Sequence, residues 1–391
     1  MTDYRIVITE DPADISQSGW DDVSGDRLHS SYRWQCFWTA AQAPTWPRSR
    51  TSMIAVYEND HIVGHCGAYR YPFPLPFNKS WQRRVARSVM WPLNPINFHK
   101  PPVVHPLADP NKVLPLLLEG IDQLRRRWLA PATRLVMLDK KQDELLFKHL
   151  AQKGYAFTPG ITDTRLDITW PSFDEYLKSA MRSKHRNFLA RCYQKATEAG
   201  ANLEVLPRPW EHKDEIIKLL RNVAARNRSE TLYAPDFLDA AKGYLEDRDV
   251  VVICARVKGK MAACTINYRD HNVLTQKSLG VDYELSQPLN LYRLIIAEGI
   301  KYAINNGISR VGCGFSQYDI KSRLGFQQAE TATAVKTWPS GLARLFAYRS
   351  GSMTAVQKSS PVSKVSPVSK VSKVSPVSKV SKVSKVSKVS R

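Results

Sequence analysis

The chain has 391 residues, of which 43% are hydrophobic, and its 57 Lys and Arg residues against 36 Asp and Glu give a net charge of +21. This length predicts two or three domains, and the excess of positive charge favours polyanionic partners such as nucleic acid, nucleotide cofactors or anionic lipid. No run approaches 18 apolar residues, and the acidic N-terminal segment is unlike a signal peptide, so we expect a soluble, cytoplasmic protein without a spanning helix.

Motifs for several other chemistries do not occur in the sequence. A G-x-S-x-G elbow, an H-E-x-x-H pair and a phosphate-binding G-x-x-x-x-G-K are all absent. The six cysteines are scattered, without a C-x-x-C or a His at ligand spacing, so we expect reduced and mostly buried thiols and no metal site. These cysteines are Cys36, Cys66, Cys192, Cys254, Cys264 and Cys313.

The first part of the chain, residues 1–170, is predicted to form one α/β lobe. Two apolar runs around the polar turn 58–61 indicate a β-hairpin, and helical spacing of apolar residues follows further along. The expected strands are Tyr4–Ile8, Met53–Tyr57, Ile62–Tyr69 and Leu135–Leu138, and the expected helices include Val113–Trp128 and Asp143–Ala151. The stretches Tyr71–Pro76 and Trp91–Pro106 are rich in proline and aromatics, and they are either plain surface loops or loops that line a binding site.

A basic segment opens the second part of the chain. Phe173–Ala199 carries Arg182, Lys184 and Arg186 among other cations, with an apolar stripe beside them. One interpretation is a solvated helical face. The other is a basic wall that binds a phosphate-bearing substrate, because Lys and Arg hold phosphate oxygens through charge-assisted bonds.

The most informative stretch is 250–326. Val250–Val257, Met261–Tyr268 and Val273–Leu279 are apolar or alternating runs separated by polar turns, which predicts a meander of three antiparallel strands. A polar loop at Tyr283–Asn290 and a helix at Leu289–Asn306 are expected next, because Pro288 lies near the start and Gly307 just past the end. A short strand at Ser309–Gly312 follows.

This order of elements resembles the acyl-CoA-binding half of the GNAT acyltransferase fold. The phrases YELSQPLNLYRLIIAEGIKYAINNGISRVGCG and YDIKSRLGF, together with the basic segment, are similar to FemAB-like N-acyltransferases of the peptidoglycan-biosynthesis type. The resemblance implies a mixed α/β fold with two GNAT-like lobes, 1–170 and 171–345, in which the second lobe is the acyltransferase lobe. It covers Trp20–Val335 loosely and Phe173–Phe326 more clearly.

The resemblance also implies a place for the cofactor. A GNAT protein holds the CoA pyrophosphate against free amides at a helix N-terminus, which would lie at Tyr283–Asn290 here. The glycine-rich signature of that loop is absent, which leaves room for another donor. Four residues could still bind the cofactor there, or be ordinary loop polars with Ser286 as a helix N-cap: Ser286, Gln287, Asn290 and Tyr292.

Two catalytic candidates come from the YDIKSRLGF phrase. Lys321 matches by pattern a lysine of the resembled family that could stabilise the negative charge developing on an attacked carbonyl. The alternative is a surface lysine paired with Asp319 or Glu330. Tyr318 could donate a proton to the leaving group, or be a packed aromatic with its hydroxyl at the surface.

The C-terminal segment 351–391 is a low-complexity repeat of Val-Ser-Lys units, which we expect to be disordered. From Met353 to Arg391 it has nine basic residues and no acidic one, so the remainder of the chain carries +12. An extended repeat would place its lysines along one edge and attract RNA or lipid headgroups, unless it is a tolerated repeat expansion without a role.

Together these patterns predict an N-acyltransferase that joins an acyl group from an acyl-CoA-type donor to the amine of a small molecule or peptide. Two alternatives remain open at this point. One is a FemAB-type ligase that uses aminoacyl-tRNA, which the basic segment favours. The other is a non-catalytic GNAT-like module that binds through its basic surface.

Overall fold

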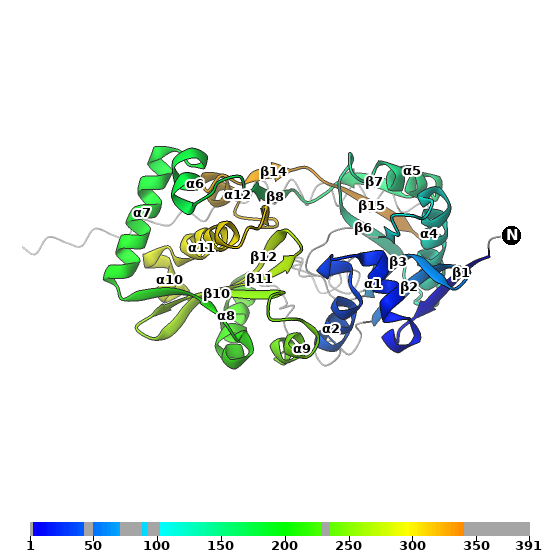
Figure 1. Ribbon diagram of the computed structural model, residues 1–391, viewed down its shortest axis with the longest axis horizontal. Coiled ribbons are helices and arrows are strands. Elements are labelled where there is room, and N and C mark those ends of the chain that lie inside the picture. The colour runs from blue at the N-terminus through cyan, green and yellow to red at the C-terminus, as the bar shows by residue number, and fades with distance from the viewer. Residues whose placement is uncertain (1–2, 43–49, 71–87, 93–101, 228–234, 340–391) are drawn as a thin grey trace, which may run out of the picture.

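The computed structural model describes residues 3–42, 50–70, 88–92, 102–227 and 235–339. Two lobes lie side by side along the long axis of the molecule, with the N-terminal segment at one end and α7 at the other (Figure 1). The predicted loop Tyr71–Pro76, most of the predicted loop 91–106 and the C-terminal repeat lie outside the described residues. Within them, no helix is both long enough and apolar enough to cross a membrane.

The first lobe contains a five-stranded antiparallel sheet. Its β2–β3 hairpin is the one that the sequence predicts, with Tyr57 opposite Ile62 and Ile54 opposite Cys66. The α4 helix packs on this sheet, and its start follows from Asp109, whose carboxylate accepts the Asn111 N–H at 2.9 Å. The strands are β1 Tyr4–Thr9, β2 Arg50–Glu58, β3 His61–Arg70, β4 Trp91–Pro92 and β5 Val103–Val104.

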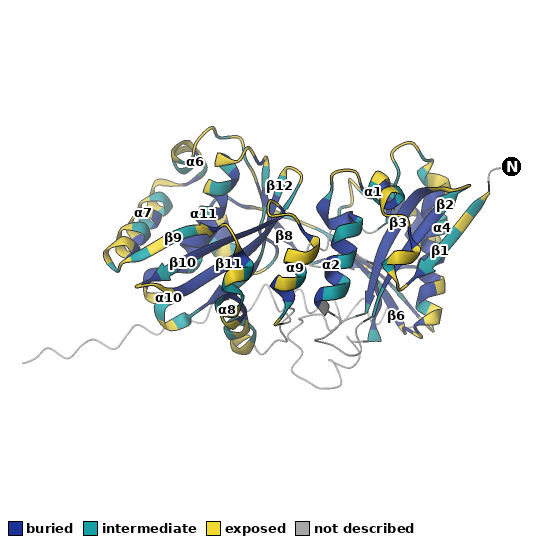
Figure 2. Ribbon diagram, turned by 60° about the horizontal axis from the view of Figure 1, so that its bottom comes forward, coloured by how far each residue is buried: buried dark blue, intermediate teal, exposed yellow. Residues whose placement is uncertain are grey.

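The second lobe is built on a seven-stranded sheet in the order β14-β8-β13-β12-β11-β10-β9. The predicted antiparallel meander is confirmed as β10–β11–β12, and β13 then pairs with β12 in parallel. The central strands are buried and helices cover them (Figure 2). The strands are β8 Asp163–Asp167, β9 Ala201–Leu206, β10 Val250–Val257, β11 Lys260–Asp270, β12 Val273–Val281, β13 Arg310–Gly312 and β14 Gln327–Ala329.

The helices of the described residues follow the expected apolar spacing, with two corrections. The basic segment forms two helices rather than one, because Met181 and Arg182 are extended between α6 and α7. The expected polar loop at Tyr283–Asn290 is wrong, since these residues form helix α10. The helices are α1 Gln17–Ser24, α2 Tyr32–Gln42, α4 Pro110–Arg127, α5 Glu144–Gln152, α6 Phe173–Ala180, α7 Ser183–Glu198, α8 Lys213–Arg226, α9 Phe237–Tyr244, α10 Tyr283–Leu289, α11 Leu291–Asn305 and α12 Tyr318–Arg323.

The chain passes between the lobes more than once. A three-stranded sheet of the first lobe, in the order β6-β15-β7, combines β6 Ala132–Leu138 and β7 Ala156–Pro159 with the late strand β15 Ala332–Thr337. Conversely, β8 pairs with β13 and β14 of the second lobe although it precedes residue 170. The domain boundary at residue 170 remains a prediction, whereas the strand pairings show that both lobes share both halves of the chain.

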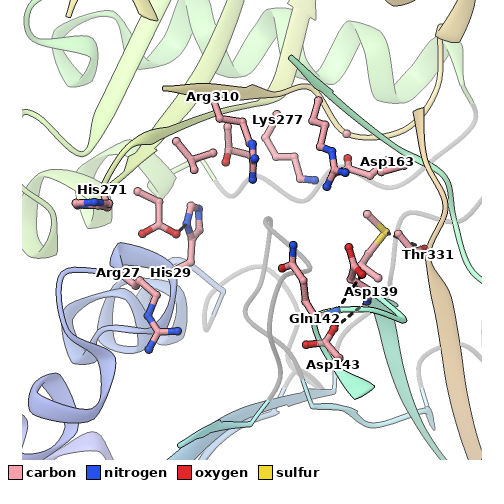
Figure 3. A pocket seen from close by; sticks show the side chains of 18 of the residues that line it. Arg27, His29, Asp139, Gln142, Asp143, Asp163, His271, Lys277, Arg310 and Thr331 are labelled. Carbon is pink, nitrogen blue, oxygen red and sulfur yellow. Dashed lines mark hydrogen bonds and ion pairs between the residues drawn. The ribbon is translucent and has the colours of Figure 1, made fainter. Parts of the chain in front are cut away.

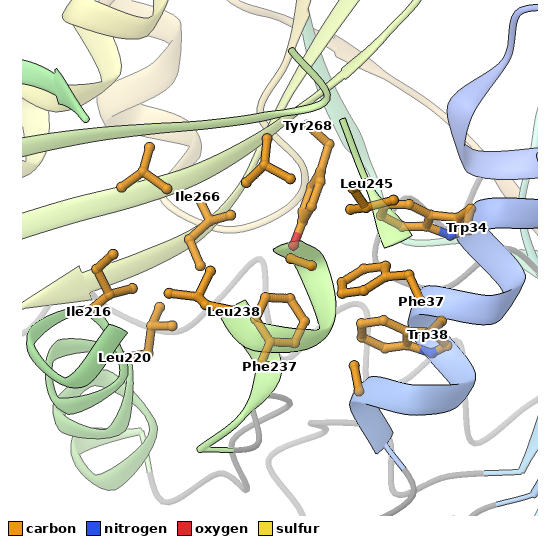
Figure 4. Packing of buried hydrophobic residues seen from close by; sticks show 14 of the residues in the cluster. Trp34, Phe37, Trp38, Ile216, Leu220, Phe237, Leu238, Leu245, Ile266 and Tyr268 are labelled. Atoms are coloured by element: carbon orange, nitrogen blue, oxygen red, sulfur yellow. The ribbon is translucent and has the colours of Figure 1, made fainter. Parts of the chain in front are cut away.

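An aromatic core joins the lobes (Figure 4). Trp34, Phe37 and Trp38 of α2 are fully buried, and the Phe37 ring lies 5.3 Å from the ring of Phe237 in α9. Trp34 also meets Tyr268 of β11 edge to face at 5.1 Å. The same cluster reaches α8 and the interior of the seven-stranded sheet, so one continuous apolar core holds the lobes together.

Polar contacts cross the same boundary. The Asp270 carboxylate accepts from the Leu28 N–H and lies 2.6 Å from His29 Nδ1. Burial acts to raise the pKa of Asp270, but the charge and hydrogen bond of His29 lower it below its usual value. Arg33 of α2 pairs with Asp249, 3.0 Å away, and with Glu246 beside it. These contacts fix the orientation of the two lobes.

This shared core leads to a stability prediction. Phe37→Leu should cost about 1–2 kcal/mol, because a shorter side chain leaves the ring contact with Phe237 unfilled. Scanning calorimetry should show one transition that moves down by a few degrees without splitting, since the core is common to both lobes. Two separate transitions, with only one of them moved, would contradict a shared core.

Candidate functional site

A cavity of about 320 Å³ lies between the two lobes, and we call it the interlobe cavity (Figure 3). Lys277 and Asp163 come from the seven-stranded sheet, and Asp139, Gln142 and Asp143 face them from the first lobe. This composition, with charged groups of both signs in a concave site, is typical of a place where a polar substrate binds.

The shape of the cavity follows from an irregularity in β12. The pairing of β11 with β12 steps from Ile266–Ser278 to Asn267–Gln276, so Lys277 is the extra residue of a β-bulge in β12. Such a β-bulge bends a strand and redirects a side chain, and bulges are frequent beside active sites. Here the bulge places Lys277 in the wall of the interlobe cavity.

The neighbouring strand separates from β12 at the same level. Parallel pairing between β12 and β13 ends at Thr275 and Gly312, although β12 continues to Val281. Beyond this point Gln276 bonds to the Ile296 carbonyl and to the Cys313 thiol, at 3.2 and 3.4 Å. The two parallel strands therefore diverge next to Lys277.

The Lys277 ammonium lies in a place that does not favour its charge. Desolvation lowers its pKa to about 8, with Lys321 acting in the same direction and Asp163 opposing both. The side chain is half-buried, so it is enclosed by the cavity wall without being sealed from it. A Cβ atom built on Gly314 would stand 3.4 Å from Lys277 Nζ, which places the ammonium beside the backbone that follows β13.

Lys321 is buried with 2% of its surface exposed, so the alternative of a surface lysine is wrong. Its Nζ donates to the carbonyl oxygens of Cys313, Gly314 and Phe315, at 2.5, 3.1 and 3.2 Å. Burial lowers its pKa from the usual value. Lys321 therefore fixes the backbone turn after β13, and it is outside the wall of the interlobe cavity.

Tyr318, the second catalytic candidate, begins α12. Its hydroxyl donates to the Thr162 carbonyl at 2.8 Å, and burial raises its pKa. The hydroxyl thus links α12 to the start of β8. Its contact with the Thr162 carbonyl holds α12 in position, and the role of Tyr318 as a proton donor stays a prediction.

The four predicted cofactor contacts lie on α10 and the first turn of α11. Ser286 is buried and is not the N-cap, because Asp282 accepts the Leu285 N–H at 3.3 Å and pairs with Lys260 at 2.9 Å. Gln287 is exposed on α10. The carboxylate of Asp282 thus caps the N-terminus of α10, whereas the pyrophosphate was expected at the N-terminus of the longer helix that follows.

The longer helix, α11, begins directly after Asn290, and no side chain caps it. Asn290, exposed and in the left-handed conformation, donates its N–H to the carbonyls of α10, and its own carbonyl accepts from Arg293 and Leu294. Tyr292 is half-buried, and burial raises its pKa. These residues lie outside the interlobe cavity, and their contact with a cofactor remains a prediction.

A second cavity, of about 570 Å³, lies among α7, α11 and α12, and we call it the basic cavity. The predicted Arg182 and Lys184 line it. Arg186 does not, because its guanidinium turns to the Leu177 and Lys178 carbonyls at 3.5 and 3.4 Å. The two cavities share no lining residue.

Sequence reasoning missed Lys277, Asp163 and Arg293. A signal existed for two of them, because a cation inside a buried strand or within an apolar helical stripe is rare unless it has a role. Lys277 lies inside the central strand β12, between Gln276 and Ser278, and Arg293 stands between Leu291 and Leu294. The proximity of Asp163 to Lys277 comes from strand pairing over more than 100 residues, which no local pattern reveals.

The two lobes share strands, and the parallel strands β12 and β13 separate beside the cavity between the lobes. Residues 183–322 match the family model described as Acetyltransferase (GNAT) domain. The structure titled FemX superposes with a TM-score of 0.56 at 11% identity, over 82% of this chain and 96% of that one. The chain therefore has a FemAB-like fold of the GNAT superfamily, as the sequence resemblance implied.

Two further solved structures share this fold. A tandem GNAT protein from the clavulanic acid biosynthesis pathway has a TM-score of 0.52 at 13% identity, over 86% of this chain and 98% of that one. L-PGS from Bacillus licheniformis has a TM-score of 0.52 at 11% identity, over 88% and 97%. At these identities the likeness concerns the fold.

Among curated proteins, one from Mycobacterium tuberculosis provisionally named 8-amino-7-oxononanoate synthase 2 is 27% identical over 234 residues. That match covers 57% of this chain and 30% of the relative, so the chain spans about a third of the length of the curated proteins it matches. The GNAT match and the shared fold support an acyltransferase-type function.

Proposed function

We propose that the protein is an N-acyltransferase that moves an acyl group from an acyl-CoA-type donor to an amine and forms an amide. One observation carries the proposal. A β-bulge places Lys277, with a pKa lowered to about 8, in the wall of the interlobe cavity where β12 and β13 separate. In this arrangement the acyl end of the donor enters between the separated strands, and the acceptor amine binds in the cavity.

Lys277 acts as the general base in this proposal. An amine attacks a carbonyl only in its neutral form, and the new C–N bond leaves a proton on nitrogen that must be removed. A lysine with a pKa of about 8 is partly neutral near pH 7.5, whereas an ordinary lysine is almost entirely protonated. Lys277 takes the proton, the C–N bond forms, the C–S bond of the thioester breaks, and the thiolate leaves.

Lys321 and Tyr318 act on the geometry of the donor side. Lys321 holds three successive carbonyls after β13, and Tyr318 ties α12 to Thr162 just before β8. The turn whose carbonyls Lys321 holds includes Gly314, which lines the interlobe cavity. Holding the reacting groups at fixed separation is a large part of catalysis for a reaction that needs no covalent intermediate.

The donor is the part of the proposal that most needs an experiment. A saturating amount of CoA should raise the melting temperature by several degrees, because a ligand at 100 times its Kd stabilises by about 2.7 kcal/mol. The measurement is a thermal-shift titration with CoA beside a tRNA binding assay at two salt concentrations.

The other outcomes are distinct. If CoA had no effect and tRNA bound with a steep salt dependence, the donor would be an aminoacyl-tRNA instead, as the basic segment allows. If neither bound, the protein would be a binding module of the same fold rather than an enzyme. Incorporation of a labelled acetyl group into a panel of amines identifies the acceptor class.

A further inference from the structure

The basic cavity has an unusual charge balance. Five cations line it, and the one carboxylate in its wall, Asp319, already pairs with Arg323 at 2.7 Å. Like charges gathered in one cavity repel each other, so such a cluster is costly unless an anion binds there. The five cations are Arg182, Lys184, Arg191, Arg293 and Arg323.

Arg293 is the strongest single observation. It is 91% buried, since 9% of its surface is exposed, and desolvation lowers its pKa. Its guanidinium carbon lies 4.6 Å from the centre of the Phe188 ring. Among the described residues, nothing accepts a hydrogen bond from its buried Nε. A buried arginine with an open donor in a cavity wall is set up to bind an anion.

The N-terminus of α7 adds a second observation in favour of an anion site. The helix begins at Ser183 after Arg182, and its first turn has no acidic residue and no side-chain cap, although acids are usual at that place. Lys184 stands in that turn instead. Burial and the charges of Arg323, Arg182 and Lys184 lower the pKa of His185, which lines the same cavity.

From these contacts we infer that the basic cavity is a binding site for a ligand that carries at least two phosphate groups. Arg293 and Arg323 bind the phosphate oxygens from α11 and α12, and Arg182 and Lys184 from the start of α7. A cavity of about 570 Å³ is within the range of small-molecule pockets, which favours a nucleotide-type ligand over an RNA strand.

We infer further that the ligand is the phosphate end of the acyl donor, and this identity rests on the proposed function. The segment Tyr283–Asn290 carries Glu284 and no Lys or Arg, whereas five cations line the basic cavity, so the basic cavity is the stronger site for the donor phosphates. A short segment of the chain joins the two cavities, because Asp319 of the basic cavity follows Gly314 of the interlobe cavity by five positions.

The test measures binding of inorganic pyrophosphate by calorimetry at constant ionic strength. The wild type should bind it saturably, and Arg293→Met should weaken binding by more than tenfold while keeping the contact with Phe188. Since Arg293 is buried, Arg323→Gln is the second variant, because Arg323 is exposed and its loss should not disturb folding. Lys195→Gln is the matched control, with the same loss of charge on α7 outside the cavity.

The three variants distinguish a phosphate site in the basic cavity from general attraction of anions. Weaker binding in both arginine variants with an unchanged Lys195→Gln supports the site. No saturable binding, or equal losses in all three variants, overturns it, and so does binding of a short single-stranded RNA in place of pyrophosphate. Because pyrophosphate binding and acyl transfer are measured in separate assays, an inactive protein that binds pyrophosphate contradicts the proposed function alone, and an active protein that does not bind it contradicts this site alone.

Discussion

Lys277→Met should lower the rate of acyl transfer by at least about 100-fold, because a positioned general base contributes 10²–10⁴-fold to such a reaction. The methionine side chain has a similar length and carries no charge. It removes the group that accepts the proton from the attacking amine and leaves the β-bulge in place. We expect the melting temperature at pH 7 to be no lower than that of the wild type, because burial disfavours the ammonium in the folded protein.

The pH dependence gives an independent readout of the same residue. The base acts in its neutral form, so the wild-type rate should rise as pH rises through about 8 and level off above it. The acceptor should have an amine that titrates well below pH 7, so that the inflection belongs to the enzyme. The Lys277→Met variant should lose the inflection.

The matched control is Lys301→Met, which removes an exposed lysine of α11 that lines neither cavity. Its rate, pH profile and melting temperature should equal those of the wild type. A Lys277→Met enzyme that kept its rate would remove Lys277 from the reaction, and one that lost its rate together with its fold would make Lys277 a structural residue.

The contribution of Lys277 to the stability of the protein should also depend on pH. Its pKa is lower in the folded protein than in the unfolded chain, so the unfolded state binds more protons between about pH 8 and the ordinary lysine value. The contribution of this group to the free energy of unfolding therefore rises with pH in that window. Comparing wild type with Lys277→Met across it isolates the effect.

The sequence predicted the meander, the hairpin of the first lobe and the FemAB-like GNAT fold, because these depend on local alternation and element order. Val250–Val257 and Met261–Tyr268 alternate or stay apolar up to clear turns, and the structure places both strands there. Apolar spacing also located α11 within two residues. Local patterns of this kind need no knowledge of distant partners.

The site was harder to predict because non-local pairing builds it. The bulge at Lys277 depends on the register of β11 against β12, which the alternation of β12 alone does not determine. Tyr283–Asn290 was expected to be a loop because of its polar residues and Pro288, yet Asp282 caps it as a helix. Pro288 lies inside this short helix and supplies no N–H to its hydrogen bonds.

The position of Lys321 changes what its mutation is expected to do. From the sequence, a lysine that stabilises developing charge should affect turnover and leave stability unchanged. The structure instead gives its Nζ three carbonyl partners in a buried site. Removing a donor from buried acceptors costs about 1–3 kcal/mol for each acceptor left without a partner.

We therefore expect Lys321→Met to lower the free energy of unfolding by about 3 kcal/mol. Gly314 keeps a second partner in Thr164, whose Oγ1 donates to the same carbonyl at 2.6 Å, so the loss falls mainly on the Cys313 and Phe315 carbonyls. A loss of this size should lower the melting temperature by roughly 6–12 °C, at 2–4 °C per kcal/mol. Lys301→Met serves again as the control and should melt with the wild type.

The transfer rate of Lys321→Met separates positioning from direct chemistry. If Lys321 positions the turn after β13, the rate measured well below the melting temperature should fall together with stability, and Lys321→Arg should not restore it, because a planar guanidinium does not fit a site built for three converging carbonyls. A variant that melted with the wild type while its rate fell more than tenfold would instead place the ammonium of Lys321 on the developing charge of the reaction.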